Sequence, residues 1–202
     1  MIDGRIRGID VMIEMFKEAK MNNQILHIEN FKQPEITWED AVNFVYKETE
    51  KQNWKLEQDF KDSHRQVIGN VLLDTGAYFL PQRNDLHNVF KGVSEFMSTV
   101  NDGSNDDCLA YYDQENGCSC DKVWHIQGLR FCIGKRPVFD HLDPSDVLYW
   151  QLLGSSYWTM NNDKVYKLNP GDLFYFSKIN SHAVHQDEPR VGIIINDFND
   201  KL

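Results

Sequence analysis

The stretch FDHLDPSDVLYWQLLGSSYW, residues 139–158, is the most informative part of the sequence. His141 and Asp143 stand two residues apart near its start, and in an extended strand residues i and i+2 point to the same face. An imidazole and a carboxylate are therefore expected side by side. A second stretch, LNPGDLFYFSKINSH at residues 168–182, begins with a turn signal, continues as an apolar strand and ends at His182.

These two stretches predict a metal site if the fold brings His182 beside the first pair. Two imidazoles and one carboxylate on one face of a metal leave coordination positions open, which is typical of non-haem Fe(II) oxygenases. A His-x-Asp pair alone is also common in surface turns. The order of the motifs, their separation of 41 residues and their β-rich surroundings favour the metal site. His185, three residues further along the chain, competes with His182 as the third ligand.

The surroundings are β-rich only in the second half of the chain. Short runs of β-branched and aromatic residues end at turn signals there, at 108–112, 123–133, 146–153, 157–160, 164–168, 172–176 and 189–196. This pattern predicts a sandwich or barrel. Earlier residues predict helices at 4–20, from Thr37 to about Asn53 and at 85–100, with a short strand at 24–31. We expect one α+β, mainly β domain spanning 1–202, in which the helical segment 1–106 packs on the outside of the β core at 107–202.

At this point the second half resembles a known family, the cupin-type, JmjC-like 2-oxoglutarate oxygenases. The resemblance covers residues 108–197, roughly. The positions that carry it are His141, Asp143, Gln151, Gly154, Trp158, Pro170, Gly171, Asp172, Leu173 to Phe176 and His182. It implies a double-stranded β-helix, also called a cupin or jelly-roll fold. It also implies that His141, Asp143 and His182 are catalytic residues that hold Fe(II), with 2-oxoglutarate as the cosubstrate of a hydroxylase. His182 is preferred to His185 because it keeps the family's distance from Pro170 and Gly171.

The sequence departs from this family where a cation is often found. Ser156 stands where related enzymes often have a Lys that pairs with the distal carboxylate of 2-oxoglutarate. Arg190, eight residues past His182, is then the candidate for that carboxylate, because a guanidinium binds carboxylates bidentately. We also count Tyr149, Gln151 and Ser156 as candidate cosubstrate contacts, although each can equally be structural. A cupin that binds a metal and a small molecule without oxygenase activity is the alternative function.

Composition sets the expected partners. The 202 residues carry 21 Lys and Arg against 31 Asp and Glu, a net charge of −10, which disfavours binding to nucleic acid. A small-molecule or a peptide or protein substrate is expected, in a cytoplasmic monomer or homodimer without a membrane span. The four cysteines Cys108, Cys118, Cys120 and Cys132 leave a zinc site with four thiolate ligands as an alternative, although their spacing contains no CxxC pair.

Overall fold

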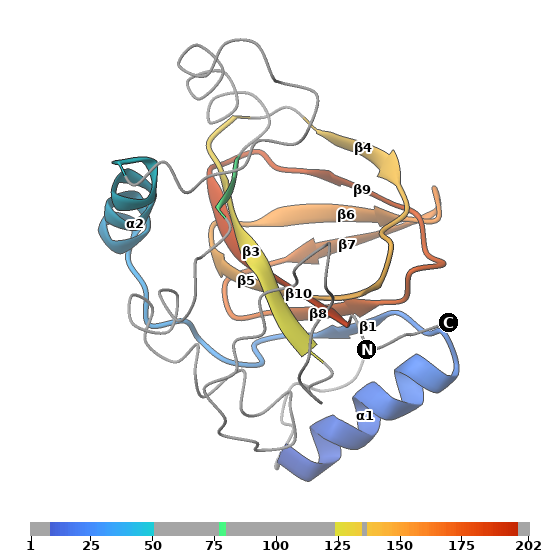
Figure 1. Cartoon of the computed structure of the whole chain (residues 1–202). Helices are drawn as coiled ribbons and strands as arrows, with labels where there is room; N and C mark the ends of the chain where they lie inside the picture. Colours follow the sequence, from blue (N-terminus) through green and yellow to red (C-terminus); the bar gives the residue numbers. More distant parts are fainter. Residues whose placement is uncertain (1–8, 51–76, 80–123, 135–136, 198–202) are drawn as a thin grey trace, which may run out of the picture.

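The computed structural model describes residues 9–50, 77–79, 124–134 and 137–197 (Figure 1). Two helices and ten strands lie in these ranges. In chain order they are α1 (Ile9–Met21), β1 (Leu26–Ile28), α2 (Trp38–Glu50), β2 (Ala77–Phe79), β3 (Trp124–Cys132), β4 (Val138–His141), β5 (Asp146–Leu153), β6 (Ser156–Met160), β7 (Lys164–Leu168), β8 (Leu173–Phe176), β9 (His182–His185) and β10 (Arg190–Asp197). The helix predicted at 85–100 and the strand predicted at 108–112 lie outside the described residues.

The strands form two antiparallel sheets that face each other (Figure 1). The larger sheet has the order β1-β8-β5-β10-β3-β2, and the smaller sheet has the order β4-β9-β6-β7. Between β3 and β10 the chain passes repeatedly from one sheet to the other, so that four strands of each sheet build a double-stranded β-helix. The predicted fold class is therefore confirmed. Strands β1 and β2 extend the larger sheet at its two edges, so the chain before residue 107 supplies strands as well as helices.

Both faces of the larger sheet are buried, which explains why its central strands are almost uniformly apolar. Along β5, Val147 and Tyr149 belong to the core between the sheets, whereas Leu148 and Trp150 belong to a second core on the outer face. Successive residues of a strand point to opposite faces, so a strand covered on both sides needs apolar residues at nearly every position. All eight residues of β5 except Leu153 are buried.

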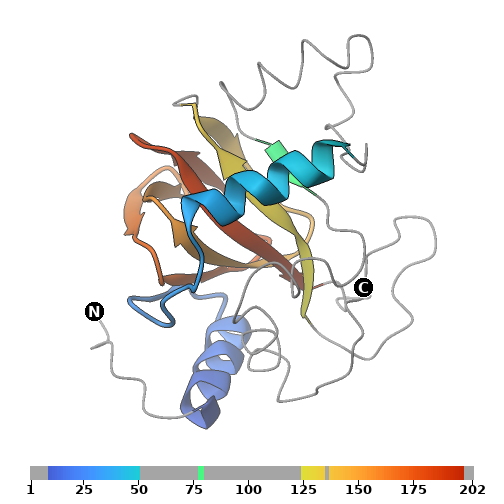
Figure 2. The same ribbon diagram turned by 90° about the vertical axis from the view of Figure 1, so that its left-hand side faces the viewer.

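The two helices cover the outer face of the larger sheet, as the sequence predicts. Phe16 and Ala19 of α1 and Ala41 and Phe44 of α2 join the outer core. In Figure 2, α2 runs across the larger sheet and α1 lies below it. Val42, the next residue of α2, is half exposed, so the buried side of this helix runs through Ala41 and Phe44. No helix in the described ranges is long and apolar enough to cross a membrane.

The start of α2 is fixed by a reciprocal pair of hydrogen bonds. The backbone N–H of Asp40 donates to Oγ1 of Thr37 at 3.2 Å, and the backbone N–H of Thr37 donates to Oδ2 of Asp40 at 2.9 Å. This is a capping box with Asp in place of the usual Glu or Gln, and it satisfies two donors that a helix start leaves unpaired. The predicted helix start at Thr37 is confirmed.

The extended strand expected from His141 onward is wrong. Strand β4 ends at His141, a short turn carries Asp143, and β5 begins at Asp146 in the other sheet. Pro144 favours this break, because the residue before a proline is held in an extended conformation and proline donates no ladder hydrogen bond. The parity argument that linked Tyr149 to His141 and Asp143 along one strand therefore fails. Strands β2, β4 and β9 are absent from the predicted set.

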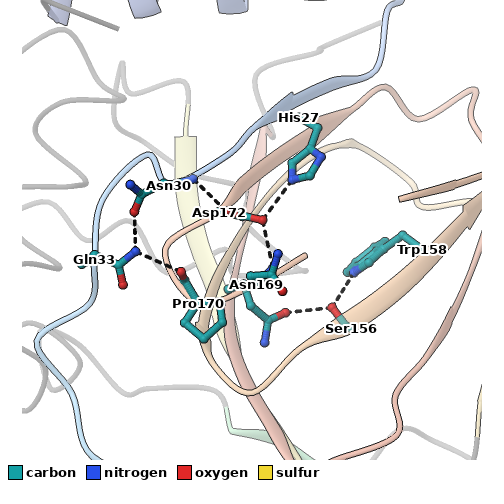
Figure 3. Close-up of polar contacts among 9 residues, drawn as sticks. His27, Asn30, Gln33, Ser156, Trp158, Asn169, Pro170 and Asp172 are labelled. Carbon is teal, nitrogen blue, oxygen red and sulfur yellow. Dashed lines mark hydrogen bonds and ion pairs between the residues drawn. The ribbon is translucent and has the colours of Figure 1, made fainter. Parts of the chain in front are cut away.

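The carboxylate of Asp172, in the turn before β8, forms hydrogen bonds with β1 and the loop that follows it (Figure 3). Asp172 accepts hydrogen bonds from the backbone N–H groups of Asn30 at 2.8 Å and Asn169 at 2.9 Å, and its Oδ2 lies 3.1 Å from Nε2 of His27. Nearby, the side chain of Gln33 donates to the Pro170 carbonyl at 3.2 Å. The Pro-Gly-Asp turn is thus the place where β1 and the loop after it are fastened to the β core.

Asp172→Asn should lower the free energy of unfolding by about 1–3 kcal/mol at pH 7. Burial alone raises the pKa of Asp172, but the hydrogen bonds from His27, Asn169 and Asn30 outweigh it and lower the pKa below its usual value. A lowered pKa in the folded state gives stability that is present above the unfolded-state pKa and is lost as the pH falls through the folded-state pKa. The difference between variant and wild type should therefore shrink below about pH 4.

Urea unfolding between pH 7 and pH 3 measures this difference. Asp163→Asn is the matched control, because Asp163 is exposed, and it should leave stability within about 0.5 kcal/mol of the wild type. An Asp172→Asn defect of equal size at pH 7 and pH 3 would show that the charge of the carboxylate is not what fastens the turn.

Candidate metal centre

The three predicted ligands lie together at one end of the smaller sheet. His141 ends β4 and His182 begins β9, and the two are direct register partners in this antiparallel pair. Their ring centroids are 4.2 Å apart. Asp143 reaches the same place from the turn after β4, and one ligand atom of each residue lies within 4.8 Å of the others. Strand register and one turn therefore assemble residues that lie 41 positions apart in the sequence.

Hydrogen bonding prepares His141 to bind a metal through Nε2. Its Nδ1 lies 2.8 Å from the carbonyl oxygen of Phe139. A carbonyl only accepts hydrogen bonds, so Nδ1 is the donor in this contact and Nε2 is the ring nitrogen left to bind a metal. Nε2 lies 3.8 Å from Oδ1 of Asp143. The ring is about two-fifths exposed, so this ligand faces the open side of the site.

His182 is the buried one of the three candidate ligands, and its ring is neutral near pH 7. Its ring packs against Trp158 with centroids 5.4 Å apart and against Phe176 at 4.5 Å. Burial, with the nearby His141 as a second cause, lowers the pKa of His182 to about 4. Protons therefore do not compete with a metal for this ring near pH 7. Nδ1 of His182 is buried and has no hydrogen-bond partner within the described residues. The backbone of Asn180 acts against the lowering of the His182 pKa, but burial outweighs it.

Asp143 supplies the negative charge of the site. Its Oδ2 lies 3.5 Å from Nε2 of His182, and its side chain is about one-quarter exposed. Burial raises the pKa of Asp143, and His141 opposes this rise. A half-buried carboxylate between two imidazoles is stabilised by a cation at the point where the three sets of lone pairs meet. The donor set of two nitrogens and one oxygen fits Fe(II) and related divalent transition metals.

His185 is separated from this group. The burial pattern along β9 alternates, with His182 and Val184 buried and His185 exposed. The His185 ring stacks on Tyr157 with centroids 4.9 Å apart and an interplanar angle of 10°. Because residues three apart in a strand point to opposite faces, His182 and His185 cannot both face the interior. The structure thus brings His182, and not His185, beside His141 and Asp143.

A second polar cluster lies deeper between the sheets, around Arg190. This side chain is 2% exposed; its Nη1 donates to the hydroxyl of Tyr149 at 2.8 Å and its Nε donates to Oε1 of Gln186 at 3.1 Å. Within the described part of the chain, no carboxylate pairs with Arg190, and no acceptor takes the hydroxyl proton of Tyr149. A buried guanidinium needs a negative partner. The cluster therefore presents donors that suit an anion.

The position of Tyr149 depends on a glycine. A Cβ atom at Gly192 would lie 2.0 Å from the hydroxyl oxygen of Tyr149, so the phenol occupies the space that any other residue would fill. Burial raises the pKa of Tyr149, against the opposing charges of Arg190 and Arg130, so the phenol keeps its proton. A protonated phenol can donate to a bound anion.

Aromatic contacts join the two clusters into one interior. The Tyr149 ring lies 4.8 Å from Trp158 between centroids, and Trp158 stacks on His182. A chain of contacts through Tyr149 and Trp158 thus connects Arg190 with His182. Both clusters lie between the two sheets, where Val147, Phe174, Phe176 and Val184 provide apolar walls.

Gln151 and Ser156, two of the predicted cosubstrate contacts, bond to each other. Ser156 Oγ donates to Oε1 of Gln151 at 2.8 Å and accepts from Nε1 of Trp158 at 3.0 Å (Figure 3). Nε2 of Gln151 donates to the carbonyl oxygens of Leu153, Gly154 and Val191. A hydroxyl has one proton, and Ser156 donates its proton to Gln151, so no donor remains for a ligand. The hydrogen bond from Trp158 to Ser156 holds the indole in place.

Two buried residues in this interior were not among the predicted site residues, Arg130 on β3 and Gln186 after β9. Arg130 is 6% exposed and Gln186 2% exposed. Nothing in the sequence distinguishes them from surface residues until the strand register is known. Of the four cysteines, Cys132 is described, and its buried sulfur accepts a hydrogen bond from Nε2 of Gln186 at 2.9 Å. The other three lie outside the described residues.

Comparison with known proteins gives partial structural similarities. No family model matches the chain, and no curated protein matches it. A cupin-superfamily protein from Desulfitobacterium hafniense is 19% identical over 41% of this chain and 73% of its own, with a TM-score of 0.34. The ribosomal oxygenase YcfD from Escherichia coli, in complex with cobalt and 2-oxoglutarate, is 23% identical over 36% of this chain and 23% of its own, with a TM-score of 0.32.

Salicylate 1,2-dioxygenase from Pseudaminobacter salicylatoxidans is also similar, with 12% identity over 37% of this chain and 21% of its own and a TM-score of 0.34. The solved structures similar to this chain thus include cupin-superfamily proteins and oxygenases. At these TM-scores the likeness is too partial to bear on function, and the fold assignment rests on the strand order itself.

Replacing a ligand should remove metal binding while the fold survives. We expect His182→Ala and Asp143→Ala to weaken Ni(II) or anaerobic Fe(II) binding by more than the ~10–100-fold that loss of a ligand's hydrogen-bond partner costs. Titration calorimetry measures the affinity, and thermal unfolding verifies the fold. His185→Ala is the matched control and should bind the metal as the wild type does. Equal losses in His182→Ala and His185→Ala would contradict the ligand set.

Proposed function

We propose that this protein is an Fe(II)- and 2-oxoglutarate-dependent oxygenase. The observation that supports this most directly is the pairing of two sites in one apolar interior. Two imidazoles and a carboxylate converge at one site, and a buried guanidinium with a phenol converges at the other. 2-Oxoglutarate has matching ends, a 2-oxo acid group that chelates a metal and a remote carboxylate that suits an arginine.

His141, Asp143 and His182 would hold the metal, which when bound supplies the activation of O2 that this reaction class needs. The remaining steps fall to the chain's own residues. Arg190 and the hydroxyl of Tyr149 bind and orient the remote carboxylate. Trp158 fixes the plane of the buried His182 ring by stacking on it. The apolar walls exclude water, which strengthens each of these electrostatic contacts.

Arg190 would also supply the positive charge that related enzymes often provide with a Lys at the position of Ser156. Ser156 cannot supply the missing positive charge, and its hydroxyl is already engaged with Gln151 and Trp158. A guanidinium entering from the start of β10 provides a full charge and a planar fork of donors. The cation and Ser156 therefore have separate tasks, and Ser156 packs and orients its neighbours.

A cupin that binds a metal and a small molecule without oxygenase activity is the second candidate. The closed network of Gln151, Ser156 and Trp158 favours it, because those polar groups are satisfied among themselves and offer nothing to a cosubstrate. In that case Arg190 and Tyr149 would bind the anionic end of another ligand. For either function we propose a small-molecule or a peptide or protein substrate, in keeping with the net charge of −10.

Purified protein with Fe(II), ascorbate and O2 should convert 2-oxoglutarate to succinate, at least slowly in the absence of substrate. Asp143→Ala should abolish succinate formation, because the metal loses its only anionic protein ligand. Arg190→Gln should raise the KM for 2-oxoglutarate by about 10–100-fold, the effect of losing a charged hydrogen bond. Succinate measured by NMR checks each rate, and Lys17→Gln, a change in an exposed residue of α1, is the control.

Binding without turnover separates the two candidates. Protein that binds Ni(II) but shows no thermal shift with 2-oxoglutarate or N-oxalylglycine is a cupin without a 2-oxoglutarate site. Full activity of Asp143→Ala would remove Asp143 from the proposed metal centre.

A further inference from the structure

The two candidate histidine ligands are held in place by different contacts. Nδ1 of His141 lies 2.8 Å from the carbonyl oxygen of Phe139, a hydrogen bond of the kind that usually orients a metal-binding histidine. Nδ1 of His182 is buried and has no hydrogen-bond partner within the described residues. The backbone of Asn180 acts on the pKa of this ring, yet its geometry with Nδ1 is not that of a hydrogen bond. The orientation of the His182 ring therefore depends on what packs against it.

Aromatic rings provide this packing. Trp158 stacks on His182 with centroids 5.4 Å apart and an interplanar angle of 24°. Phe176 and His141 contact the same imidazole at steeper angles of 53° and 51°. Both members of the stacked pair are buried, with Trp158 4% exposed and His182 3% exposed. The indole is thus the contact that lies nearest to parallel with the imidazole, and a change in its plane would change the plane of His182.

A chain of hydrogen bonds fixes the indole in turn. Nε1 of Trp158 donates to Oγ of Ser156 at 3.0 Å, and Oγ of Ser156 donates to Oε1 of Gln151 at 2.8 Å (Figure 3). Ser156 and Gln151 have no exposed surface. Nε2 of Gln151 donates at 2.8, 3.1 and 3.3 Å to three backbone carbonyls, those of Leu153, Gly154 and Val191. The indole is thereby connected to the backbone of the larger sheet.

The donors in this chain can point in one direction only. Backbone carbonyls accept hydrogen bonds and never donate them, so the amide nitrogen of Gln151 faces them and its oxygen faces Ser156. The Ser156 hydroxyl therefore donates to Gln151 and keeps its lone pairs for the indole N–H, which can only donate. A lysine at position 156 would carry donors alone and could not accept from Trp158. A hydroxyl at this position suits an indole two residues later.

We propose that Gln151 and Ser156 are positioning residues for His182. Their hydrogen bonds hold the Trp158 indole, and the indole holds the imidazole so that its Nε2 stays near Asp143, 3.5 Å from Oδ2. This stacking takes the place of the ring-nitrogen hydrogen bond that usually orients a metal-binding histidine. The consequence for metal binding rests on the proposed function, whereas the arrangement itself belongs to the metal-free protein.

The orientation of His182 is measured by NMR on the metal-free protein with labelled histidine. The ring current of a stacked indole shifts the imidazole resonances upfield, and the loss of signals in His182→Ala assigns them. We expect Ser156→Ala to lose most of this upfield shift and Ser156→Thr, which keeps the hydroxyl, to retain it. Ser155→Ala is the matched control, because the Ser155 hydroxyl donates to Glu188 at the surface, and its spectrum should match the wild type.

Metal affinity provides the second measurement, with Ni(II) as the probe in titration calorimetry. We expect Ser156→Ala to raise the Kd by about 10–100-fold, the usual effect of losing a group that orients a ligand, and Ser156→Thr to restore most of the affinity. Trp158→Phe keeps an aromatic ring but removes the N–H. In that background Ser156→Ala should change the Kd by less than about twofold, because Ser156 acts through the indole.

Two results overturn the positioning role. Additive losses in the double variant of Ser156→Ala and Trp158→Phe would show that Ser156 merely supports the fold. His182 resonances that stay unchanged in Ser156→Ala would show that the hydroxyl does not set the ring plane. If Ser156→Ala does not fold, Ser156→Cys carries both comparisons, since a thiol fills the same space but accepts hydrogen bonds weakly.

The same measurements keep this inference separate from the enzyme proposal. A wild type that binds no Ni(II) overturns the proposed metal centre, and the NMR comparison on the metal-free protein still decides the role of Ser156. Turnover of 2-oxoglutarate by the wild type, together with an unaltered His182 spectrum and Ni(II) affinity in Ser156→Ala, supports the oxygenase and overturns the positioning role.

Discussion

Burial of both faces of the larger sheet is the constraint on which the rest of this structure depends. A sheet covered by helices on one side and by a second sheet on the other has no solvent for its polar groups. Its inward-facing polar residues must therefore bond to each other or to a ligand. Gln151 donates hydrogen bonds to backbone carbonyls, and Ser156 accepts one from Trp158. The hydrogen-bonding groups of Arg190 and Tyr149 are only partly paired within the described residues, which is why we propose these two, and not Gln151 and Ser156, as binding residues.

The sequence predicts the elements whose patterns are strong and misses those defined by tertiary pairing. Strands β5, β8 and β10 are apolar on both faces and end at turn signals, so their runs are recognisable locally. The Thr37 capping box marks the start of α2 in the same way. Strand β4 has two exposed residues between two partly buried ones, and β9 carries two histidines. Such short segments become strands because a neighbour pairs with them, which no local pattern reveals.

In the candidate site, too, the residues in recognisable motifs are predicted and those placed by strand pairing are missed. The two motifs and the family resemblance predict His141, Asp143 and His182 as candidate ligands, and the structure brings these residues together. The reasoning for Tyr149 assumed one unbroken strand, whereas β4 and β5 belong to different sheets, and Tyr149 faces inward through the register of β5 with β10. Arg130 could not be recognised, because its direction depends on pairing with Gly192 across 62 residues of sequence.

If the proposed metal binds, the facing positions of His141 and His182 also make the stability of the fold depend on the metal supply. Residues 41 positions apart meet only in the native chain, so a cation held by both is bound by the folded state and not by the unfolded one. By mass action, free metal at a hundred times its Kd adds about 2.7 kcal/mol to stability. A chelator in the buffer would remove that contribution, and resistance to proteolysis would then depend on the free-metal concentration.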